Sequence, residues 1–371
     1  MHNLIQNICN QFNIYGNITR IKTFTSGHIN STYLIDVSEQ DSLKQFVLQR
    51  INHNVFKNPD NVMDNISNVT NHIKQQIRSK GEHSSRRVLR FYPTNNGKYY
   101  YEDNNGYYWR IYKYVNNSIT FDNTENLKVL EETGKAFGEF QLLLDKYPIK
   151  DLHIIIPHFH NTVNRYKIFR DTISNNPVNR AQNVQTEIKE FLLLEDLATK
   201  MYKMQKNNEL PLRVTHNDTK CNNVLFDKNT NNHLCVIDLD TVMPGLIGFD
   251  FGDAIRFAAN TCKEDETNLE MVKLDLEKFE AFTRGFLSEV GSHLTPKELE
   301  TLSLGAITMS IECGLRFLTD YIDGDNYFKI SYEDHNLDRA CCQLALAQDM
   351  IKNYYQMQQI VENCIKEYNI N

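Results

Sequence analysis

Several features that would place a protein in a specialised class are scarce in this sequence. The 371 residues contain eight scattered cysteines and no Cys-x-x-Cys pair. The adjacent Cys341 and Cys342 fall in a helical pattern, where they are poorly placed to form a disulfide with each other. No apolar run approaches the roughly 18 residues that a membrane-spanning helix requires, and the N-terminus shows no basic start followed by an apolar run. We therefore expect a cytoplasmic protein with reduced cysteines and no membrane partner.

An excess of one charge is also missing. Forty Lys and Arg residues stand against 47 Asp and Glu, which gives a net charge of −7 with both signs interspersed. This balance argues against a broad surface for nucleic acid, so small molecules are the expected partners. The length suggests two domains or lobes. The oligomeric state has no signature in the sequence.

The first third of the chain has the pattern of a small β-rich lobe. Apolar alternation over residues 18–24, 32–37 and 45–51 predicts an antiparallel meander. Helix-spaced apolar residues follow over 58–77, after Pro59 at a first-turn position. Two short strands near 87–92 and 98–102 and a strand over 107–114 complete the predicted lobe.

Helical periodicity dominates the rest of the chain. Apolar residues recur at helical spacing over 125–145 and 186–206, and Thr295-Pro-Lys-Glu298 has the spacing of a capping box before a long apolar helix that runs through Tyr321. The pattern predicts an α+β protein of two lobes, a mostly antiparallel-sheet lobe over residues 1–113 and a larger helical lobe over residues 114–371.

One segment carries groups that suit phosphoryl transfer. Asp218 and Asn223 lie five residues apart on a turn between apolar runs, as in the kinase catalytic loop, where the Asp accepts the proton of the substrate hydroxyl and the Asn holds a metal ion. Asp238 ends the next apolar run, where a second metal-binding carboxylate is expected. Each residue alone is common in turns. Together they predict a kinase that uses ATP and Mg²⁺.

A literal Asp-Phe-Gly triplet occurs at Asp250–Gly252, beyond a turn that contains Pro244 and Gly245. Protein kinases use such a triplet to bind metal. Here its spacing from Asp218 is too long. We therefore assign metal binding to Asp238, and we expect the Asp250 carboxylate to accept hydrogen bonds from backbone N–H groups of the catalytic loop.

These motifs resemble the aminoglycoside phosphotransferase and choline kinase superfamily, which keeps His-Gly-Asp…Asn and Ile-Asp in these roles. Longer blocks are similar to the N-acetylhexosamine 1-kinases, namely residues 27–33, 47–52, 215–220, 236–245 and 314–321. The resemblance covers nearly the whole chain. It implies a bilobal protein-kinase-like fold and transfer of phosphate from ATP to the anomeric hydroxyl of N-acetylglucosamine or N-acetylgalactosamine.

The segment Thr25–Asn30 falls between the first two predicted strands. By sequence alone it fits an ordinary hairpin turn as well as a loop whose backbone N–H groups bind phosphate. The resemblance favours the loop, with Ser26 and Gly27 at the phosphates and His28 at the sugar.

The third strand of a kinase presents a Lys to the phosphates, and here the choice is Gln49 or Arg50. Adjacent strand positions face opposite sides, so a one-residue slip would exchange them. The resemblance to choline kinases favours Arg50. The next helix offers Asp64 where a Glu partner is usual. By the same resemblance Tyr112 and Tyr114 lie in the hinge that binds adenine.

Lys220 lies close enough to Asp218 in the sequence to neutralise the γ-phosphate, unless it is a solvated loop lysine. Arg316 occurs within an apolar helix, so it must be paired, face a cleft or reach the surface. The resemblance places Arg316 at the sugar hydroxyls, with Tyr321 nearby. We expect no metal at His153, His158 and His160.

Two other interpretations remain open at the level of sequence. The acceptor could be an aminoglycoside, choline or another amino alcohol. Choline would call for an aromatic and acidic cage, and an aminoglycoside for an acidic groove, of which the cluster Glu264–Glu266 is a hint. The chain could also be an inactive nucleotide-binding scaffold, an idea motivated by the departures at Gln49 and Asp64.

Overall fold

The structure is a computed structural model that describes residues 2–24, 30–39, 42–122 and 124–370. It divides into two compact units. Unit 1 contains the chain up to Ile119 together with Lys146–Pro157 and Leu225–Met243, and unit 2 contains Thr120–Asp145, His158–Val224 and the chain from Pro244 onward. The sequence predicted continuous lobes divided at residue 113, whereas two later segments return to unit 1.

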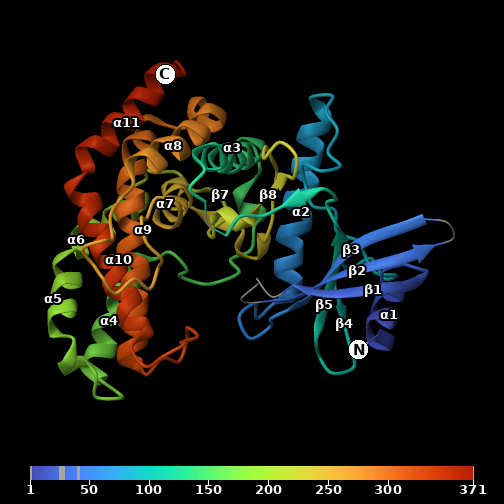
Figure 1. The fold of residues 1–371 in the computed structure, drawn as a ribbon, viewed down its shortest axis with the longest axis horizontal. Coiled ribbons are helices and arrows are strands. Elements are labelled where there is room, and N and C mark those ends of the chain that lie inside the picture. The colour runs from blue at the N-terminus through green and yellow to red at the C-terminus, as the bar shows by residue number, and fades with distance from the viewer. Residues whose placement is uncertain (1, 25–29, 40–41, 123, 371) are drawn as a thin grey trace. The chain divides into compact units, whose positions relative to one another are not determined.

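Unit 1 is built on a five-stranded antiparallel sheet with the order β1-β2-β3-β5-β4 (Figure 1). Its helices and strands, with short 3-10 helices written η, are α1 (His2–Gln11), β1 (Asn17–Phe24), β2 (Ser31–Glu39), β3 (Ser42–Ile51), α2 (Pro59–Ser79), β4 (Tyr101–Glu102), β5 (Tyr108–Lys113), β6 (Ser118–Ile119), η1 (Ile149–Asp151), β8 (Val224–Asp227), β9 (His233–Val236) and η4 (Leu239–Thr241). The predicted meander and the helix after it are confirmed.

The two faces of this sheet have different partners. One face of the sheet forms a core with α1 that includes Phe46, Leu48, Trp109 and Ile111. The sequence pattern did not predict α1. Cross-strand partners share a face of a sheet. The pair Gln49 and Arg110 therefore lies on the other face, where Arg110 contacts Met63 of α2.

Helix α2 begins as its sequence predicts. The side chain of Asn58 accepts a hydrogen bond from the backbone N–H of Asn61, and Pro59 occupies the first turn. The apolar residues predicted to share one face are all buried, namely Val62, Ile66, Val69, Ile73 and Ile77. The segment after α2 differs from the prediction. Of the two short strands expected there, only Tyr101–Glu102 forms one within the described residues, and Phe91 makes a single bridge to Tyr112.

Unit 2 is mainly helical. Its elements are α3 (Leu127–Leu144), α4 (Thr162–Asn175), η2 (Ala181–Asn183), α5 (Gln185–Leu193), α6 (Glu195–Lys206), β7 (Arg213–Thr215), η3 (Cys221–Asn223), β10 (Met243–Gly245), α7 (Ile247–Ala258), α8 (Leu276–Val290), η5 (Gly291–His293), α9 (Pro296–Asp323), α10 (His335–Lys352) and α11 (Tyr354–Glu367). The predicted capping box of Thr295 and Glu298 is present at the start of α9. Among the described residues, no helix combines the length and the apolar character needed to cross a membrane.

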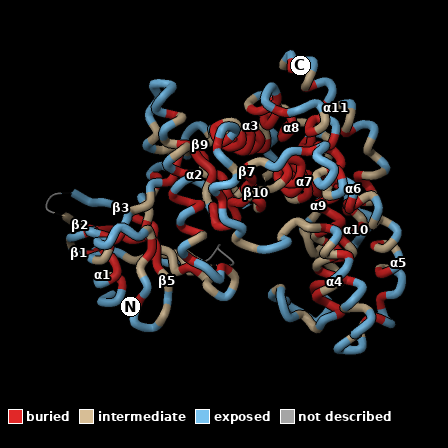
Figure 2. Tube along the Cα trace, turned by 180° about the vertical axis from the view of Figure 1, so that it is seen from behind, coloured by how far each residue is buried: buried red, intermediate tan, exposed pale blue. Residues whose placement is uncertain are grey.

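Helices α7 and α9 approach each other through glycines. Helix α7 is buried over nearly its whole length (Figure 2). A Cβ on Gly252 would lie 2.3 Å from the carbonyl oxygen of Gly305, and one on Gly305 would lie 2.0 Å from that of Gly248. These are backbone atoms, so a side chain could fit only if the helices moved apart. The close approach fixes α7, which carries Asp250 and Asp253.

Replacement of Gly305 by Ala should therefore destabilise the protein, by about 1–3 kcal/mol as for other overpacked cores. Chemical denaturation of purified protein measures the change. Glu300→Ala, at an exposed position of the same helix, is the matched control and should stay within about 0.5 kcal/mol of the parent. Equal stabilities for Gly305→Ala and the control would contradict the close packing.

Candidate active site

The catalytic loop predicted from the sequence lies in unit 2, between β7 and η3. Strand β7 pairs with β10, and the chain then turns through His216, Asn217 and Asp218. His216 is fully buried, and its ring stands edge-on to Phe137 and Phe140 of α3 at centroid distances of 5.6 and 5.9 Å. The loop is thus anchored in the apolar core of the unit.

Asn217 adopts a left-handed backbone conformation, with φ of 63°. Glycine enters this region freely, and Asn enters it more readily than most residues. The superfamily pattern has Gly at this position. The chain therefore departs from that pattern in residue type, and Asn217 adopts a backbone conformation that Gly would enter freely.

Asp250 holds the loop by its backbone. Its two carboxylate oxygens accept hydrogen bonds from the N–H groups of His216 and Asn217, at 2.7 and 2.8 Å, and Gln141 donates to it at 2.9 Å. The Thr219 hydroxyl donates to the Asp250 carbonyl oxygen. Burial raises the pKa of Asp250, against the hydrogen bonds that it accepts. The predicted structural role of Asp250 in clamping the loop is confirmed.

Asp218, Lys220 and Asn223 come together at the end of this loop. The Lys220 Nζ lies 2.9 Å from one carboxylate oxygen of Asp218. Asn223 Nδ2 donates to the other oxygen at 3.1 Å and to the Asp218 carbonyl oxygen at 2.8 Å. Burial acts to raise the pKa of Asp218, but the Lys220 ammonium and these contacts outweigh it and hold the pKa below its usual value. Asp218 is therefore an ionised hydrogen-bond acceptor at neutral pH.

The side chain of Asn223 offers an amide oxygen that could bind a metal ion. Asn223 donates to Asp218 through Nδ2, and among the described residues its amide oxygen Oδ1 accepts no hydrogen bond. Amide and carboxylate oxygens are the ligands that Mg²⁺ prefers. In unit 1, Asp238 follows β9 and has a left-handed backbone, with φ of 59°, at the start of η4. The two predicted metal ligands are thus of the right chemical type.

A buried ion pair in unit 1 links η4 to the sheet. Both guanidinium nitrogens of Arg110 bind Asp240, at 2.5 and 2.7 Å, and the two side chains are only 2% and 3% exposed. Asp240 also accepts from Asn30 Nδ2 at 2.8 Å, and Arg110 Nε donates to the Gln49 amide oxygen at 2.9 Å. Burial opposes ionisation of Asp240, but the Arg110 charge holds the pKa of that carboxyl below its usual value.

Neither Arg110 nor Asp240 is among the site residues that the sequence predicted. The available signal was a charged residue between Trp109 and Ile111 in an otherwise apolar strand, since a charge in such a place must be paired. The partner could not be read in the same way, because it lies 130 residues away.

Gln49 and Arg50 lie on opposite faces of the five-stranded sheet, and each has different partners there. Gln49 bonds to Arg110 on the face of α2. Arg50 lies on the opposite face, where its guanidinium stacks 4.7 Å from the centroid of the Tyr107 ring and donates to Ser31 Oγ at 3.3 Å. Asp64 is 62% exposed and lies 3.6 Å from His153 Nε2. Arg110 and Asp240, and not residues 50 and 64, form the buried ion pair.

The other predicted nucleotide residues lie on or near β5. Tyr112 packs in an apolar cluster with Leu89, Phe91 and Ile237, and burial raises its pKa. The Tyr114 backbone N–H is bonded to the carbonyl oxygen of Gln45. The predicted residues Ser26, Gly27 and His28 lie outside the described residues.

Arg316, predicted to contact the acceptor, stands among aromatic rings in unit 2. Its guanidinium lies 5.7, 5.8 and 5.3 Å from the ring centroids of Phe159, Tyr327 and Phe328. One turn earlier on α9, the buried Glu312 binds His160 Nδ1 at 2.8 Å.

Glu312 is likewise absent from the site residues that the sequence predicted. Burial alone would raise its pKa, but the bond from His160 and the charge of Arg165 hold it below the usual value. Tyr321, predicted to lie near Arg316, is engaged elsewhere. Its hydroxyl donates to Asp334 at 3.2 Å, and its ring lies under Arg180.

The family of the chain follows from comparison with known proteins. The model of the phosphotransferase enzyme family matches residues 20–282, and the chain belongs to this family. It is accordingly a small-molecule phosphotransferase that acts on hydroxyl groups. Its α+β fold is kinase-like, as the sequence predicted.

Solved structures share this fold at low sequence identity. A microcompartment-associated aminopropanol kinase is 15% identical with a TM-score of 0.65, and 96% of this chain and 98% of that chain are covered. The choline kinase of Cryptosporidium parvum Iowa II is 14% identical with a TM-score of 0.56, covering 96% and 97%. A spectinomycin phosphotransferase in complex with ADP and spectinomycin is 12% identical with a TM-score of 0.54, covering 98% and 97%.

Replacement of Asp218 by Asn should leave the fold intact and lower turnover by roughly 10²–10⁴-fold, the usual contribution of a general base. Because the Lys220 ammonium holds the pKa of Asp218 below its usual value, this carboxylate stays ionised as the pH falls from 8 to about 5, and it should give the parent enzyme no acidic limb in that range. Steady-state ADP release across this pH range measures both effects. Near-normal turnover of the folded variant would remove Asp218 from the mechanism.

Replacement of Asp240 by Leu should cost about 3–5 kcal/mol, because it leaves the Arg110 charge buried and unpaired. The double variant Arg110→Met, Asp240→Leu removes both charges and should recover most of that loss. A double-mutant cycle by chemical denaturation tests the pair. Additive effects of the two substitutions would show that the charges do not interact.

Proposed function

We propose that the chain is an ATP-dependent kinase that phosphorylates the anomeric hydroxyl of an N-acetylhexosamine. Family membership supports phosphate transfer to a small molecule, and the resemblance of residues 27–33 and 314–321 to the N-acetylhexosamine 1-kinases supports the acceptor. The observation that most supports an uncharged acceptor is the position of Arg316. Its guanidinium already lies close to three aromatic rings.

The positive charge of Arg316 disfavours a cationic acceptor. A choline-like acceptor is bound by aromatic faces that remain open to the ligand cation. Here the guanidinium of Arg316 faces the rings of Phe159, Tyr327 and Phe328, so a second cation would meet both a like charge and occupied rings. A sugar instead offers hydroxyl and carbonyl oxygens to the guanidinium and apolar C–H groups to the rings.

The acidic cluster that suggested an aminoglycoside groove is engaged within the protein. Glu264 binds the buried Arg256 at 2.7 Å, and Asp265 lies 3.3 Å from His335. Arg256 also holds Asp253 at 3.0 Å. These carboxylates serve internal pairs, which supports a neutral acceptor over a polycationic one.

In the proposed mechanism Asp218 orients the acceptor hydroxyl and takes its proton as the oxygen attacks the γ-phosphorus of ATP. The bond between that phosphorus and the β,γ-bridging oxygen breaks, and ADP leaves with the electron pair. Lys220, 2.9 Å from Asp218, offsets charge on the transferred group. The pKa of Lys220 is raised, first by Asp218, so the ammonium stays charged. Asn223 and Asp238 are the proposed Mg²⁺ ligands, and the ion would neutralise the phosphates.

Further parts of the site remain predictions from the resemblance. The residues assigned to the nucleotide are Ser26, Gly27, Arg50, Tyr112 and Tyr114, and those assigned to the sugar are His28, Arg316 and Tyr321. Arg50 is bonded on the face of β3 away from Arg110, and Tyr321 is bonded to Asp334. Both would have to exchange these partners for a ligand, so Arg316 is the stronger of the proposed contacts.

A substrate panel tests the proposal against its alternatives. ADP release should be measured with Mg-ATP and N-acetylglucosamine, N-acetylgalactosamine, choline, aminopropanol or spectinomycin, with Asp218→Asn as the control for background hydrolysis. We expect turnover with an N-acetylhexosamine alone. Turnover with choline, aminopropanol or spectinomycin in its place would overturn the sugar assignment, and no turnover with any acceptor would favour an inactive scaffold.

Replacement of Arg316 by Met keeps the apolar stem and removes the guanidinium. It should raise the KM for the sugar by about tenfold, equivalent to about 1.4 kcal/mol, and leave the KM for ATP unchanged. Arg339→Met is the matched control, because Arg339 also stacks on a ring of unit 2, that of Phe317 at 5.4 Å. An equal rise in the two variants would show that Arg316 has no special contact with the acceptor.

A further inference from the structure

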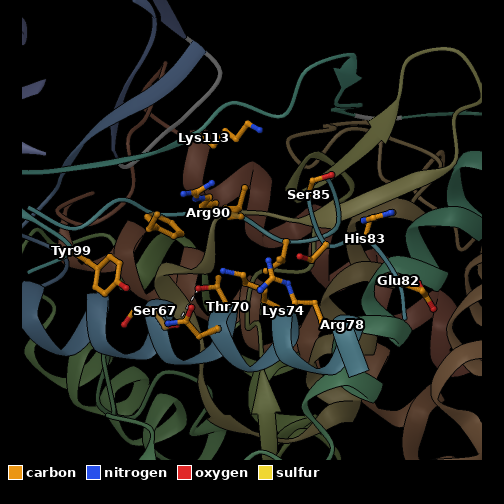
Figure 3. A pocket seen from close by; sticks show the side chains of 15 residues that line it. Ser67, Thr70, Lys74, Arg78, Glu82, His83, Ser85, Arg90, Tyr99 and Lys113 are labelled. Carbon is orange, nitrogen blue, oxygen red and sulfur yellow. Dashed lines mark hydrogen bonds between the residues drawn. The ribbon is translucent and has the colours of Figure 1, made fainter. Parts of the chain in front are cut away.

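Unit 1 contains a cavity of about 370 Å³ whose lining includes none of the predicted catalytic and nucleotide residues. One wall is a face of α2 on which Ser67, Thr70, Asn71, Lys74 and Arg78 recur at the helical spacing that places residues side by side. The opposite wall comes from residues 82–85 and 88–91, together with Tyr99 and Lys113 (Figure 3). The volume of the cavity suits a small metabolite, because small-molecule sites begin at about 300 Å³.

The charged groups of this cavity are mainly basic. Lys74, Arg78, Arg90 and Lys113 line it, against the single carboxylate of Glu82. Glu82 is already paired with Arg87. Within the part of the chain that the structure describes, none of the four basic side chains forms an ion pair. Arg78, Arg90 and Lys113 are exposed, so the cluster is a basic patch at the surface of a protein whose net charge is −7.

Neutral polar groups accompany these charges. Asn71, Ser84, Ser85 and Tyr99 line the same cavity, and none of their side chains has a hydrogen bond to another of the described residues. The apolar part of the lining is small, namely Val88, Leu89 and Phe91. A ligand that matches this surface carries negative charge at one end and hydroxyl groups at the other.

From these observations we propose that the cavity binds a small phosphate monoester that bears hydroxyl groups, such as a hexose phosphate. The phosphate would lie among Lys74, Arg78, Arg90 and Lys113, because Arg and Lys are the usual partners of phosphate oxygens. The hydroxyl groups would meet Asn71, Ser84, Ser85 and Tyr99. The proposal does not depend on the identity of the acceptor.

The cavity shares two side chains with the cluster that contains the predicted adenine-binding residue Tyr112. Leu89 and Phe91 line the cavity and also pack in that cluster with Tyr112 and Ile237, which directly precedes Asp238. The Phe91 and Tyr112 ring centroids are 5.1 Å apart. A ligand that shifts Phe91 would therefore act on Tyr112, so we expect occupancy to change the affinity for ADP.

Isothermal titration calorimetry of the full chain with glucose 6-phosphate, in the absence of ATP and acceptor, tests the site directly. We expect the double variant Lys74→Gln, Arg78→Gln to bind at least tenfold more weakly than the parent. The control Lys57→Gln, Lys80→Gln loses the same charge at exposed positions before and after α2 and should bind like the parent. A second pair on the other wall, Arg90→Gln with Lys113→Gln, should repeat the loss.

The outcomes separate the possible explanations. No binding of glucose 6-phosphate, or an equal loss in the control variant, would overturn the site. Glucose or inorganic phosphate binding as tightly as the ester would overturn the ligand class. An ADP affinity that is the same with and without the ester would overturn the coupling. None of these results depends on turnover, so the failure of this proposal is distinguishable from failure of the proposed function.

Discussion

The hydrogen bonds from Asp250 to the backbone of His216 and Asn217 are the constraint on which the catalytic loop depends. A loop that must present Asp218 cannot rely on its own short sequence to keep one conformation, because fixing each backbone residue costs about 1–2 kcal/mol of entropy. Here the carboxylate satisfies two consecutive N–H groups at once. Burial makes this arrangement stronger, since the alternative is unpaired polar groups in a low-dielectric core.

The clamp is only as rigid as the helix that carries it. Asp250 lies in the first turn of α7, and α7 is held against α9 by the backbone contact at Gly252 and Gly305. A chain of constraints therefore runs from glycine packing through a buried carboxylate to the geometry of Asp218. In unit 1 a buried ion pair, and not glycine packing, holds the segment that carries Asp238. The Arg110 and Asp240 pair joins β5 to η4, where Asp238 begins the short helix.

The sequence predicted what depends on short-range patterns and could not predict what depends on distant pairing. Periodicity located the meander, the face of α2 and the capped start of α9, and spacing assigned Asp250 to the loop backbone. Arg110 and Asp240 escaped because their partnership is set by tertiary contact. Gln49 and Arg50 could not be separated, because a slip of one residue in the predicted register would exchange the faces on which the two side chains lie. The cavity beside α2 had no signature, since its basic residues come from separate segments.

The central claim is that the protein transfers phosphate from ATP to the anomeric oxygen of an N-acetylhexosamine, with Asp218 accepting the proton of that hydroxyl. The most direct measurement is phosphorus and proton NMR of the product formed from N-acetylglucosamine and Mg-ATP, because coupling of phosphorus to the anomeric proton identifies the oxygen that was phosphorylated. The account predicts this coupling in the product and no product from the methyl glycoside, in which that oxygen is blocked. Phosphate on another hydroxyl, or a methyl glycoside that reacts like the free sugar, would contradict it.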